Sequence, residues 1–168
     1  MKKFPKILFA DLDGTLITTA SGKTFAEDPT DFRIKKDVLD AIRNLKEHGL
    51  RGIYIVSNQG GIPEFISEHD FETKMMAIKA FIDGYVQLYT YARWCSSMDP
   101  QCPRRKPNTG MLEECWSIFK HYGYKKEDCL MIGDASGKPG DFSDSDKKTA
   151  ENFGIDYLDV DQFVKEYK

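Results

Sequence analysis

The stretch KILFADLDGTL, residues 6–16, places two aspartates directly after a short apolar run. The run at residues 7–10 is expected to be a buried strand, and side chains two residues apart on extended backbone point to the same side. Asp11 and Asp13 therefore bring two carboxylates together, which is costly unless a cation or a proton lies between them. A divalent cation with oxygen ligands, such as Mg²⁺, removes that repulsion. A plain polar turn is the alternative, but a turn needs no carboxylate pair there.

The rest of the chain alternates short apolar runs with helical periodicity, which is typical of a parallel sheet covered by helices on both faces. Strands are expected at residues 7–10, 52–56, 85–91, 129–132 and 155–158. Helices are expected to end before Gly49, to begin at Ser67, to carry Met111, Cys115, Ile118 and Tyr122 on one apolar face, and to end at Phe153. We therefore predict an α/β fold, a three-layer sandwich with a mainly parallel sheet of about five strands, in one domain over residues 1–168.

The composition excludes several other classes of protein. Apolar residues make up 40% and charged residues 30% of the 168 residues, which is ordinary for a globular protein. Lys and Arg number 24 against 27 Asp and Glu, so the net charge of −3 provides no general basic field for long nucleic acid. Four cysteines are too few for a secreted disulfide scaffold, and the first apolar run is too short for a signal peptide or membrane span. We expect a soluble, cytoplasmic protein with reduced thiols and no membrane partner.

Polar residues also follow the later strands, at the edge where open α/β sheets place their sites. Ser57 and Asn58 follow the second predicted strand, where Ser-Asn also suits a turn or a helix cap. Lys106 precedes a helix that Thr109 is expected to cap, and a solvated basic run is the other interpretation there. Asp134 follows the fourth predicted strand.

These strand-end residues, in this order, resemble the four motifs of the haloacid dehalogenase superfamily of phosphotransferases, and the resemblance covers essentially the whole chain. It implies that Asp11 attacks phosphorus and becomes an aspartyl phosphate. Asp13 would protonate the leaving oxygen and then take a proton from the hydrolytic water. Ser57 and Lys106 would meet the charge on the equatorial oxygens, because positioning and charge neutralisation carry most of phosphoryl transfer.

The same resemblance implies a Mg²⁺ ion held by Asp11, Asp134 and the backbone carbonyl of Asp13. Asp146 is a further candidate ligand. It is the weaker one, because Ser143 and Asp146 also have the spacing of a capping box for the helix that follows.

Longer sequence segments around these motifs resemble one branch of this superfamily. The segments LDGTLITTASGKTF, DPTDFR, SNQGGI, RKPNTGM and GDASGKPGDFSDSDKKTAENFGI look like those of the polynucleotide 3′-phosphatase family. That likeness implies removal of a 3′-phosphate from a DNA or RNA end, at a site that has no cap domain. It also implies a minimal flap around residues 18–23, for which a simple hairpin tip is the other interpretation. The predicted substrate-binding residues are Gly14, Thr15, Thr18, Ser21, Lys23, Asn58 and Arg105. No GxxxxGK[ST] stretch is present, so no kinase activity is expected.

Two other functions fit parts of the sequence. A sugar-phosphate phosphatase of the heptose bisphosphate or histidinol phosphate type shares the capless build and often has a Cys-rich zinc loop before the third motif. Cys95 and Cys102 lie there, but two thiols alone do not complete a tetrahedral zinc site. A non-catalytic module that binds phosphorylated ends would lose a catalytic carboxylate, yet both Asp11 and Asp13 are present.

Aromatic residues gather around the third predicted strand. Tyr89, Tyr91 and Trp94, with Arg93, could stack on the terminal bases of a nucleic acid. Packing in the core explains Tyr89 and Tyr91 better, because aromatic residues favour buried strands.

Overall fold

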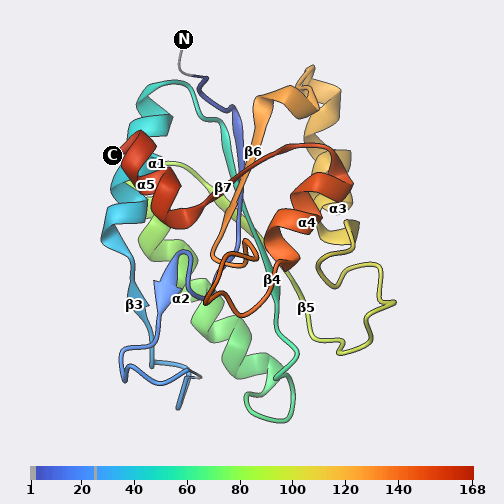
Figure 1. The fold of residues 1–168 in the computed structure, drawn as a ribbon. Coiled ribbons are helices and arrows are strands. Elements are labelled where there is room, and N and C mark those ends of the chain that lie inside the picture. Colours follow the sequence, from blue (N-terminus) through green and yellow to red (C-terminus); the bar gives the residue numbers. More distant parts are fainter. Residues whose placement is uncertain (1–2, 25) are drawn as a thin grey trace.

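A five-stranded parallel sheet forms the centre of the computed structural model, which describes residues 3–24 and 26–168 (Figure 1). The strands lie in the order β5, β4, β1, β6, β7, so that β1 occupies the middle. Their bounds are Ile7–Ala10 for β1, Gly52–Asn58 for β4, Thr90–Cys95 for β5, Cys129–Gly133 for β6 and Asp156–Asp159 for β7. Every neighbouring pair in this sheet is parallel, which confirms the predicted α/β class.

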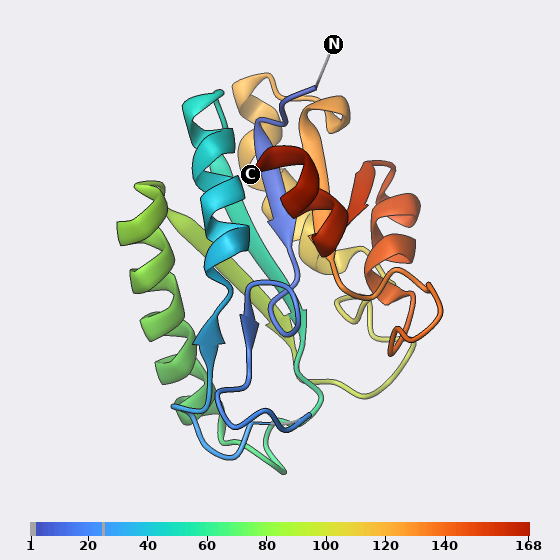
Figure 2. The ribbon, with the colours of Figure 1, turned by 60° about the vertical axis from the view of Figure 1, so that its left-hand side comes forward.

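Helices cover both faces of the sheet, as Figures 1 and 2 show. On one face lie α1 (Lys36–Glu47), α2 (Glu68–Val86) and α5 (Val160–Tyr167), and on the other α3 (Gly110–Phe119) and α4 (Ser145–Phe153). Two 3-10 turns, η1 (Lys120–Tyr122) and η2 (Lys126–Asp128), precede β6. The sequence analysis did not predict α5. Within the described residues, no helix is both long and apolar enough to cross a membrane.

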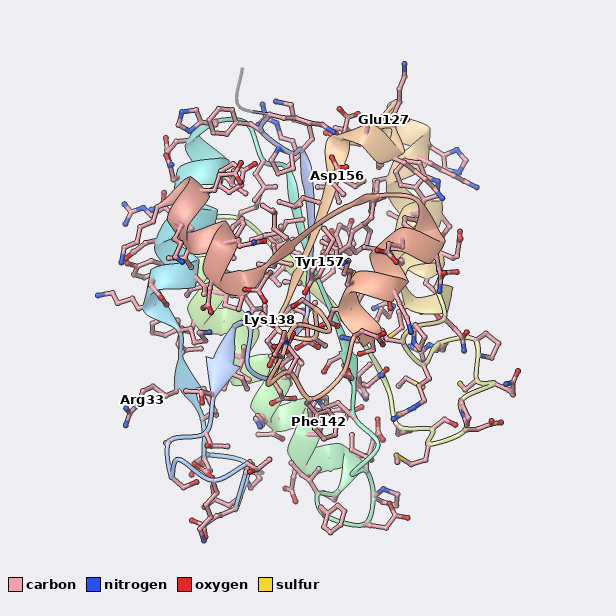
Figure 3. All side chains as sticks on the ribbon, in the orientation of Figure 1. Arg33, Glu127, Lys138, Phe142, Asp156 and Tyr157 are labelled. Atoms are coloured by element: carbon pink, nitrogen blue, oxygen red, sulfur yellow. The ribbon has the colours of Figure 1, made fainter. Side chains whose placement is uncertain are left out.

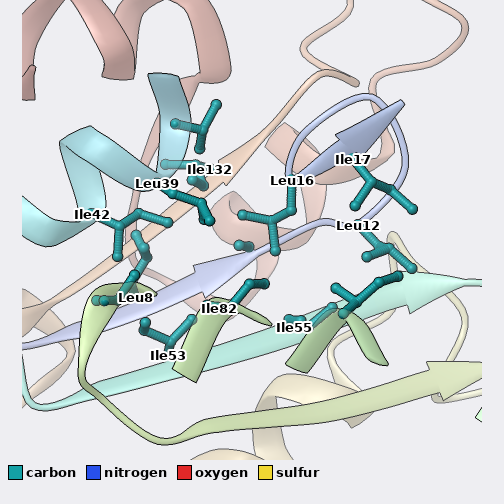
Figure 4. Close-up of a cluster of buried hydrophobic side chains, with 14 of the residues drawn as sticks. Leu8, Leu12, Leu16, Ile17, Leu39, Ile42, Ile53, Ile55, Ile82 and Ile132 are labelled. Carbon is teal, nitrogen blue, oxygen red and sulfur yellow. The ribbon is translucent and has the colours of Figure 1, made fainter. Parts of the chain in front are cut away.

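The side chains of β1 alternate between the two helical layers. Leu8 and Ala10 join the apolar cluster that includes α1, α2 and α5, whereas Ile7 and Phe9 join the cluster with α3 and α4. Figure 4 shows part of the first cluster, in which Leu8 lies close to α1. Each fully buried side chain of this size stabilises the fold by roughly 1.5–3 kcal/mol. Strand β1 is therefore fixed from both faces, and it holds the acidic loop that follows in place.

The third predicted strand, at residues 85–91, is wrong in its bounds. Helix α2 continues to Val86, because the apolar spacing that includes Ile78 and Ile82 extends to Val86. Gln87 ends the helix in the left-handed region with φ 57°. Strand β5 begins only at Thr90, whose backbone N–H donates to the Asp83 carboxylate at 2.7 Å. The predicted start of α2 is confirmed, since the Ser67 hydroxyl accepts from Asp70 N at 3.0 Å.

Several predicted core positions lie on the surface instead. Tyr89 and Tyr91 are 60% and 40% exposed, so the prediction that they pack in the core is wrong. On the helix after Lys106, Met111 and Cys115 are buried as predicted, but Ile118 and Tyr122 are exposed. Phe119 takes the buried place because α3 ends there and the chain tightens into η1. The Thr109 side chain makes no capping hydrogen bond, so its predicted cap is wrong too.

A small antiparallel pair, β2 (Ile17–Thr18) with β3 (Arg33–Ile34), rises beside the main sheet and carries the flap between them. The buried Asp31 carboxylate organises this flap. It accepts hydrogen bonds from the backbone N–H groups of Ser21 and Glu27 at 2.7 and 2.8 Å, and from the Ser21 hydroxyl at 2.8 Å. These contacts hold the pKa of Asp31 low, at about 2, chiefly through the Glu27 and Ser21 N–H groups.

Candidate active site

The strand-end residues gather at the carboxyl edge of the sheet. Ala10 of β1 lies level with Ile55 of β4 and Ile132 of β6, so the loops after these strands emerge side by side (Figure 2). Asp11 N–H donates to Ile132 O at 3.0 Å, which extends the β1 to β6 pairing by one residue. The first acid of the motif is therefore placed by the sheet itself.

The buried ammonium group of Lys106 lies between two carboxylates at this edge of the sheet. Lys106 Nζ contacts Asp11 Oδ1 and Asp146 Oδ1, each at 2.6 Å, and all three residues are buried. Burial raises the pKa of Asp11, and the Lys106 cation opposes that rise without cancelling it. Burial disfavours the charge on Lys106, but the two carboxylates outweigh it and raise the pKa above its usual range. Lys106 is therefore held as a cation against the predicted nucleophile.

Asp134 completes an acidic cluster around this cation. One oxygen each of Asp11, Asp134 and Asp146 lies within 4.8 Å of the others. Burial and the neighbouring Asp146 raise the pKa of Asp134 to about 6. A Cβ on Gly14, where φ is 79°, would collide with Asp134 Oδ2, so the loop after β1 needs glycine at this close approach. Three carboxylates around one lysine form an oxygen-rich, net negative cluster that fits a hard divalent cation.

Asp146 does not cap a helix, so the capping-box interpretation with Ser143 is wrong. The residue at the N-cap of α4 is Asp144, and its side chain makes no cap bond. Asp146 instead turns its carboxylate inward, where Oδ2 accepts from Ala135 N at 3.1 Å while Oδ1 accepts from Lys106. A Cβ on Gly133 would collide with this carboxylate. A partner forty positions away in sequence thus outcompetes the local cap.

The Asp13 carboxylate lies outside the three-acid cluster and is exposed. Gln59 Nε2 donates to Asp13 Oδ2 at 2.6 Å and to the buried Ser57 Oγ at 2.8 Å. One amide thus joins the second motif acid to the second motif hydroxyl. Gln59 lies within the SNQGG segment but was not predicted as a site residue; its position two residues after Ser57 was the available signal.

Two predicted substrate-binding residues have protein partners at the site. Asn58 Oδ1 accepts from Lys106 N at 2.9 Å and its Nδ2 donates to Lys106 O at 3.0 Å, so this side chain fixes the lysine loop. The buried Thr15 hydroxyl donates to Asp11 Oδ2 at 3.3 Å, beneath the acid. Lys35, which was not predicted, donates to Gly14 O at 2.9 Å and adds positive charge near Asp134.

The other predicted substrate-binding residues lie further out. In the described flap, Thr19 donates to Lys23 O, and Lys23 pairs with Glu27, so these contacts remain within the flap. Ser21 is held by Asp31 as described above, and Thr18 is an exposed residue of β2. Arg105 Nη1 donates to Ser97 O at 2.8 Å on the loop after β5.

The two cysteines of the predicted zinc-loop position lie close together. Cys95 Sγ and Cys102 Sγ are 3.6 Å apart and both are free thiols. Among residues 3–24 and 26–168, the Asp11, Asp134 and Asp146 cluster is the one group of three or more side chains suited to a metal. Cys115 and Cys129 are buried in the core, as predicted.

The sheet order and the strand-end side chains give the chain the fold of haloacid dehalogenase-like phosphatases. The D,D-heptose 1,7-bisphosphate phosphatase from B. bronchiseptica, solved with magnesium and phosphate, has the same fold with a TM-score of 0.69. It is 18% identical to this chain, and the match covers 90% of this chain and 78% of that one.

The sequence narrows the class to a family. The profile described as polynucleotide kinase 3 phosphatase matches residues 6–164, and the chain belongs to that family. The bifunctional polynucleotide phosphatase/kinase of Schizosaccharomyces pombe is 36% identical over 168 residues, covering 97% of this chain and 38% of that protein. The histidine biosynthesis bifunctional protein HisB of Campylobacter jejuni is 34% identical over 157 residues, covering 89% of this chain and 40% of that protein. This chain therefore spans less than half the length of either relative.

Proposed function

We propose that this phosphatase removes the 3′-phosphate from polynucleotide ends, DNA in particular, through an aspartyl phosphate on Asp11 and with the help of Mg²⁺. The observation that carries the proposal is the buried contact of Lys106 with Asp11 and Asp146 beneath an open edge of the sheet. Such a lysine favours the ionised form of the attacking carboxylate against the opposing effect of burial, and it meets phosphoryl charge from the same atom. Removing a 3′-phosphate leaves the 3′-hydroxyl that repair of a DNA end requires.

The acidic cluster provides the ligands for the cation. Asp11, Asp134 and the backbone carbonyl of Asp13 would hold Mg²⁺, with Asp146 a weaker candidate because both of its oxygens have protein partners. When bound, the cation offsets the repulsion among the acids and draws charge from a phosphoryl oxygen. The magnesium and phosphate reported with the heptose bisphosphate phosphatase of the same fold support this assignment.

The chain's own side chains would then divide the reaction. An Asp11 oxygen attacks phosphorus as the bond to the leaving oxygen breaks, and Asp13 gives that oxygen its proton. Asp13 next accepts a proton from the water that attacks the aspartyl phosphate, which releases inorganic phosphate and restores Asp11. Ser57 and Lys106 hold the equatorial oxygens throughout, and Gln59 orients both Asp13 and Ser57.

The substrate class rests on the motifs and on family membership. The family description and the S. pombe relative both name polynucleotide phosphatase chemistry. Between β1 and α1, the described residues form the β2–β3 flap as the one further element. A sugar-phosphate substrate is the second candidate, favoured by the similarity to the C. jejuni HisB protein. A non-catalytic end-binding module ranks lower, because Asp11 and Asp13 are both in place at the edge of the sheet.

Phosphate release from a 3′-phosphorylated oligonucleotide, measured beside heptose bisphosphate and histidinol phosphate with and without Mg²⁺, tests this proposal. We expect Mg²⁺-dependent release with a clear preference for the oligonucleotide. Asp11→Asn should abolish turnover while phosphorylated ends still bind. A preference for either small substrate would overturn the polynucleotide assignment and leave the aspartyl phosphate chemistry standing.

A further inference from the structure

Three large apolar side chains are exposed to solvent on the loops that contribute residues to the site. Phe142, on the loop after Asp134, is 96% exposed. Phe65, on the loop after Gln59, is 91% exposed, and Met98, on the loop before Lys106, is 66% exposed. We call these three residues the rim. Side chains of this size gain free energy when a partner covers them, so their position around a substrate site calls for an explanation.

Contacts connect part of the rim to the second motif. Gly60 follows Gln59 directly, and a Cβ there would collide with Met98 Sδ and lie 3.4 Å from Arg105 Nη1. A Cβ on the next residue, Gly61, would lie 3.3 Å from Phe65 Cδ2. Gly60 and Gly61 thus lie in a turn with Met98 and Phe65 against them and the Arg105 guanidinium beside Gly60. This turn directly follows Gln59, whose amide holds Asp13 and Ser57.

Phe142 is held outward by the turn that precedes it. The Asp141 carboxylate accepts from Ser136 N, Ser136 Oγ and Lys138 N at 2.9, 2.6 and 3.1 Å, which closes the loop after β6. Figure 3 shows Phe142 below Lys138, over the lower part of the molecule in that view. The ring is therefore presented to solvent by an ordered turn directly after Asp134.

We propose that the rim is the stacking surface for the nucleobases that precede the phosphorylated end, with Arg105 beside it for a backbone phosphate. This inference rests on the proposed function. Every nucleobase has a π face, so stacking on exposed Phe and Met side chains accepts any sequence, and the arginine supplies the charge that the net −3 chain lacks overall. A sugar phosphate has neither bases nor a second phosphate for this surface.

The aromatic residues around β5, which the sequence offered for base stacking, lie away from the site. Tyr89 and Tyr91 are exposed as base-stacking residues would be, but they lie at the start of β5, whereas the site lies beyond its end at Cys95. Tyr91 stacks on the Tyr54 ring instead, and Tyr89 meets Tyr91 edge-on. Trp94 donates its indole N–H to Glu68 at 3.0 Å. We therefore assign base stacking to the rim residues on the three loops, and not to the aromatic residues of β5.

Steady-state kinetics on 3′-phosphorylated substrates of increasing length, from a mononucleotide to a ten-nucleotide strand, test the inference. In the wild type we expect kcat/KM to rise with length, and an abasic nucleotide next to the end to remove much of that gain. Phe142→Ala and Phe65→Ala should each lower kcat/KM for the ten-nucleotide strand about 5-fold or more, given ~1–3 kcal/mol per stacked base. The mononucleotide should be cleaved at the wild-type rate. In the two Phe variants, an abasic nucleotide next to the end should lower kcat/KM only slightly further.

Tyr122→Ala is the matched control, because Tyr122 is 76% exposed in η1 at the opposite edge of the sheet. It should leave the length dependence unchanged. If the wild type prefers long strands and both Phe variants keep that preference, the rim inference is wrong and the proposed function stands. If the wild type cleaves sugar phosphates as well as any strand, the substrate class itself is wrong, and the rim inference falls with it.

Discussion

Lys106 shows how a single side chain ties the site to the stability of the fold. Its ammonium group is shared between Asp11 and Asp146 at 2.6 Å each, with 2% of the side chain exposed. A buried ion pair of this kind adds little net stability, but removing one partner leaves a buried charge without compensation. The same contact that would prepare Asp11 for attack in the proposed reaction therefore also makes the neighbouring structure depend on Lys106.

Replacing Lys106 by Met should destabilise the metal-free protein by about 3–5 kcal/mol, because two buried carboxylates then face each other without a cation. Urea unfolding in the presence of a chelator measures this change, and added Mg²⁺ should recover part of it. Lys148→Met, which breaks a solvent-exposed pair with Asp144, is the control and should cost much less. Equal losses in the two variants would contradict the account of Lys106.

Asp134 gives the site a pH dependence whose sign follows from its raised pKa of about 6. Below that pH the carboxyl carries a proton that a cation must displace, and above it the ligand is already ionised. Binding of Mg²⁺, followed through the shift in thermal midpoint, should therefore tighten as pH rises from 5 to about 7.5. Asp134→Asn should weaken the binding and flatten this dependence. A wild-type affinity that is constant across this range would count against Asp134 as a ligand.

At the scale of elements, the flap depends on one buried carboxylate. Asp31 accepts hydrogen bonds from the N–H groups of Ser21 and Glu27 and from the Ser21 hydroxyl. These hydrogen bonds to a charge hold the flap together, beside the packing of Phe32 against the apolar cluster.

Asp31 should therefore stabilise the protein in a pH-dependent way. Its pKa is about 2 in the folded protein and about 4 when unfolded, so its contribution is fully present above pH 4 and is lost as pH falls through 2. In urea titrations between pH 5 and 2.5, we expect wild type to exceed Asp31→Asn in stability at the upper end, with the gap closing toward the lower end. A gap that widens on acidification would show that the charge is not what fastens the flap.

The elements also show which parts of the structure a sequence can predict. Ser67 and Asp70 form the expected cap because both partners lie within one turn and nothing distant competes. Ser143 and Asp146 have the same spacing, but Lys106 binds Asp146, and that contact forms only when the loop after β5 and the start of α4 meet at the carboxyl end of the sheet. The motif acids were predictable because parallel strands share one carboxyl edge. The role of Gln59 was not, since its partners come from two separate loops.

The whole molecule combines a small, net negative chain with a substrate that is an anion. Charge alone therefore cannot attract the proposed substrate, and under the proposed function binding is local, through Lys106 and Ser57 at phosphorus and through the rim and Arg105 further out. The central claim beneath all of this is that Asp11 carries the phosphoryl group between its two acceptors.

Trapping that state tests the claim most directly. The enzyme is mixed with Mg²⁺ and an oligonucleotide whose 3′-phosphate is radiolabelled, quenched in acid within one turnover, digested, and mapped by mass spectrometry. The account predicts one labelled phosphoryl group on the peptide that contains Asp11, absent in Asp11→Asn, and discharged when unlabelled substrate is added before the quench. Turnover with no label on that peptide, or turnover retained by Asp11→Asn, would contradict it.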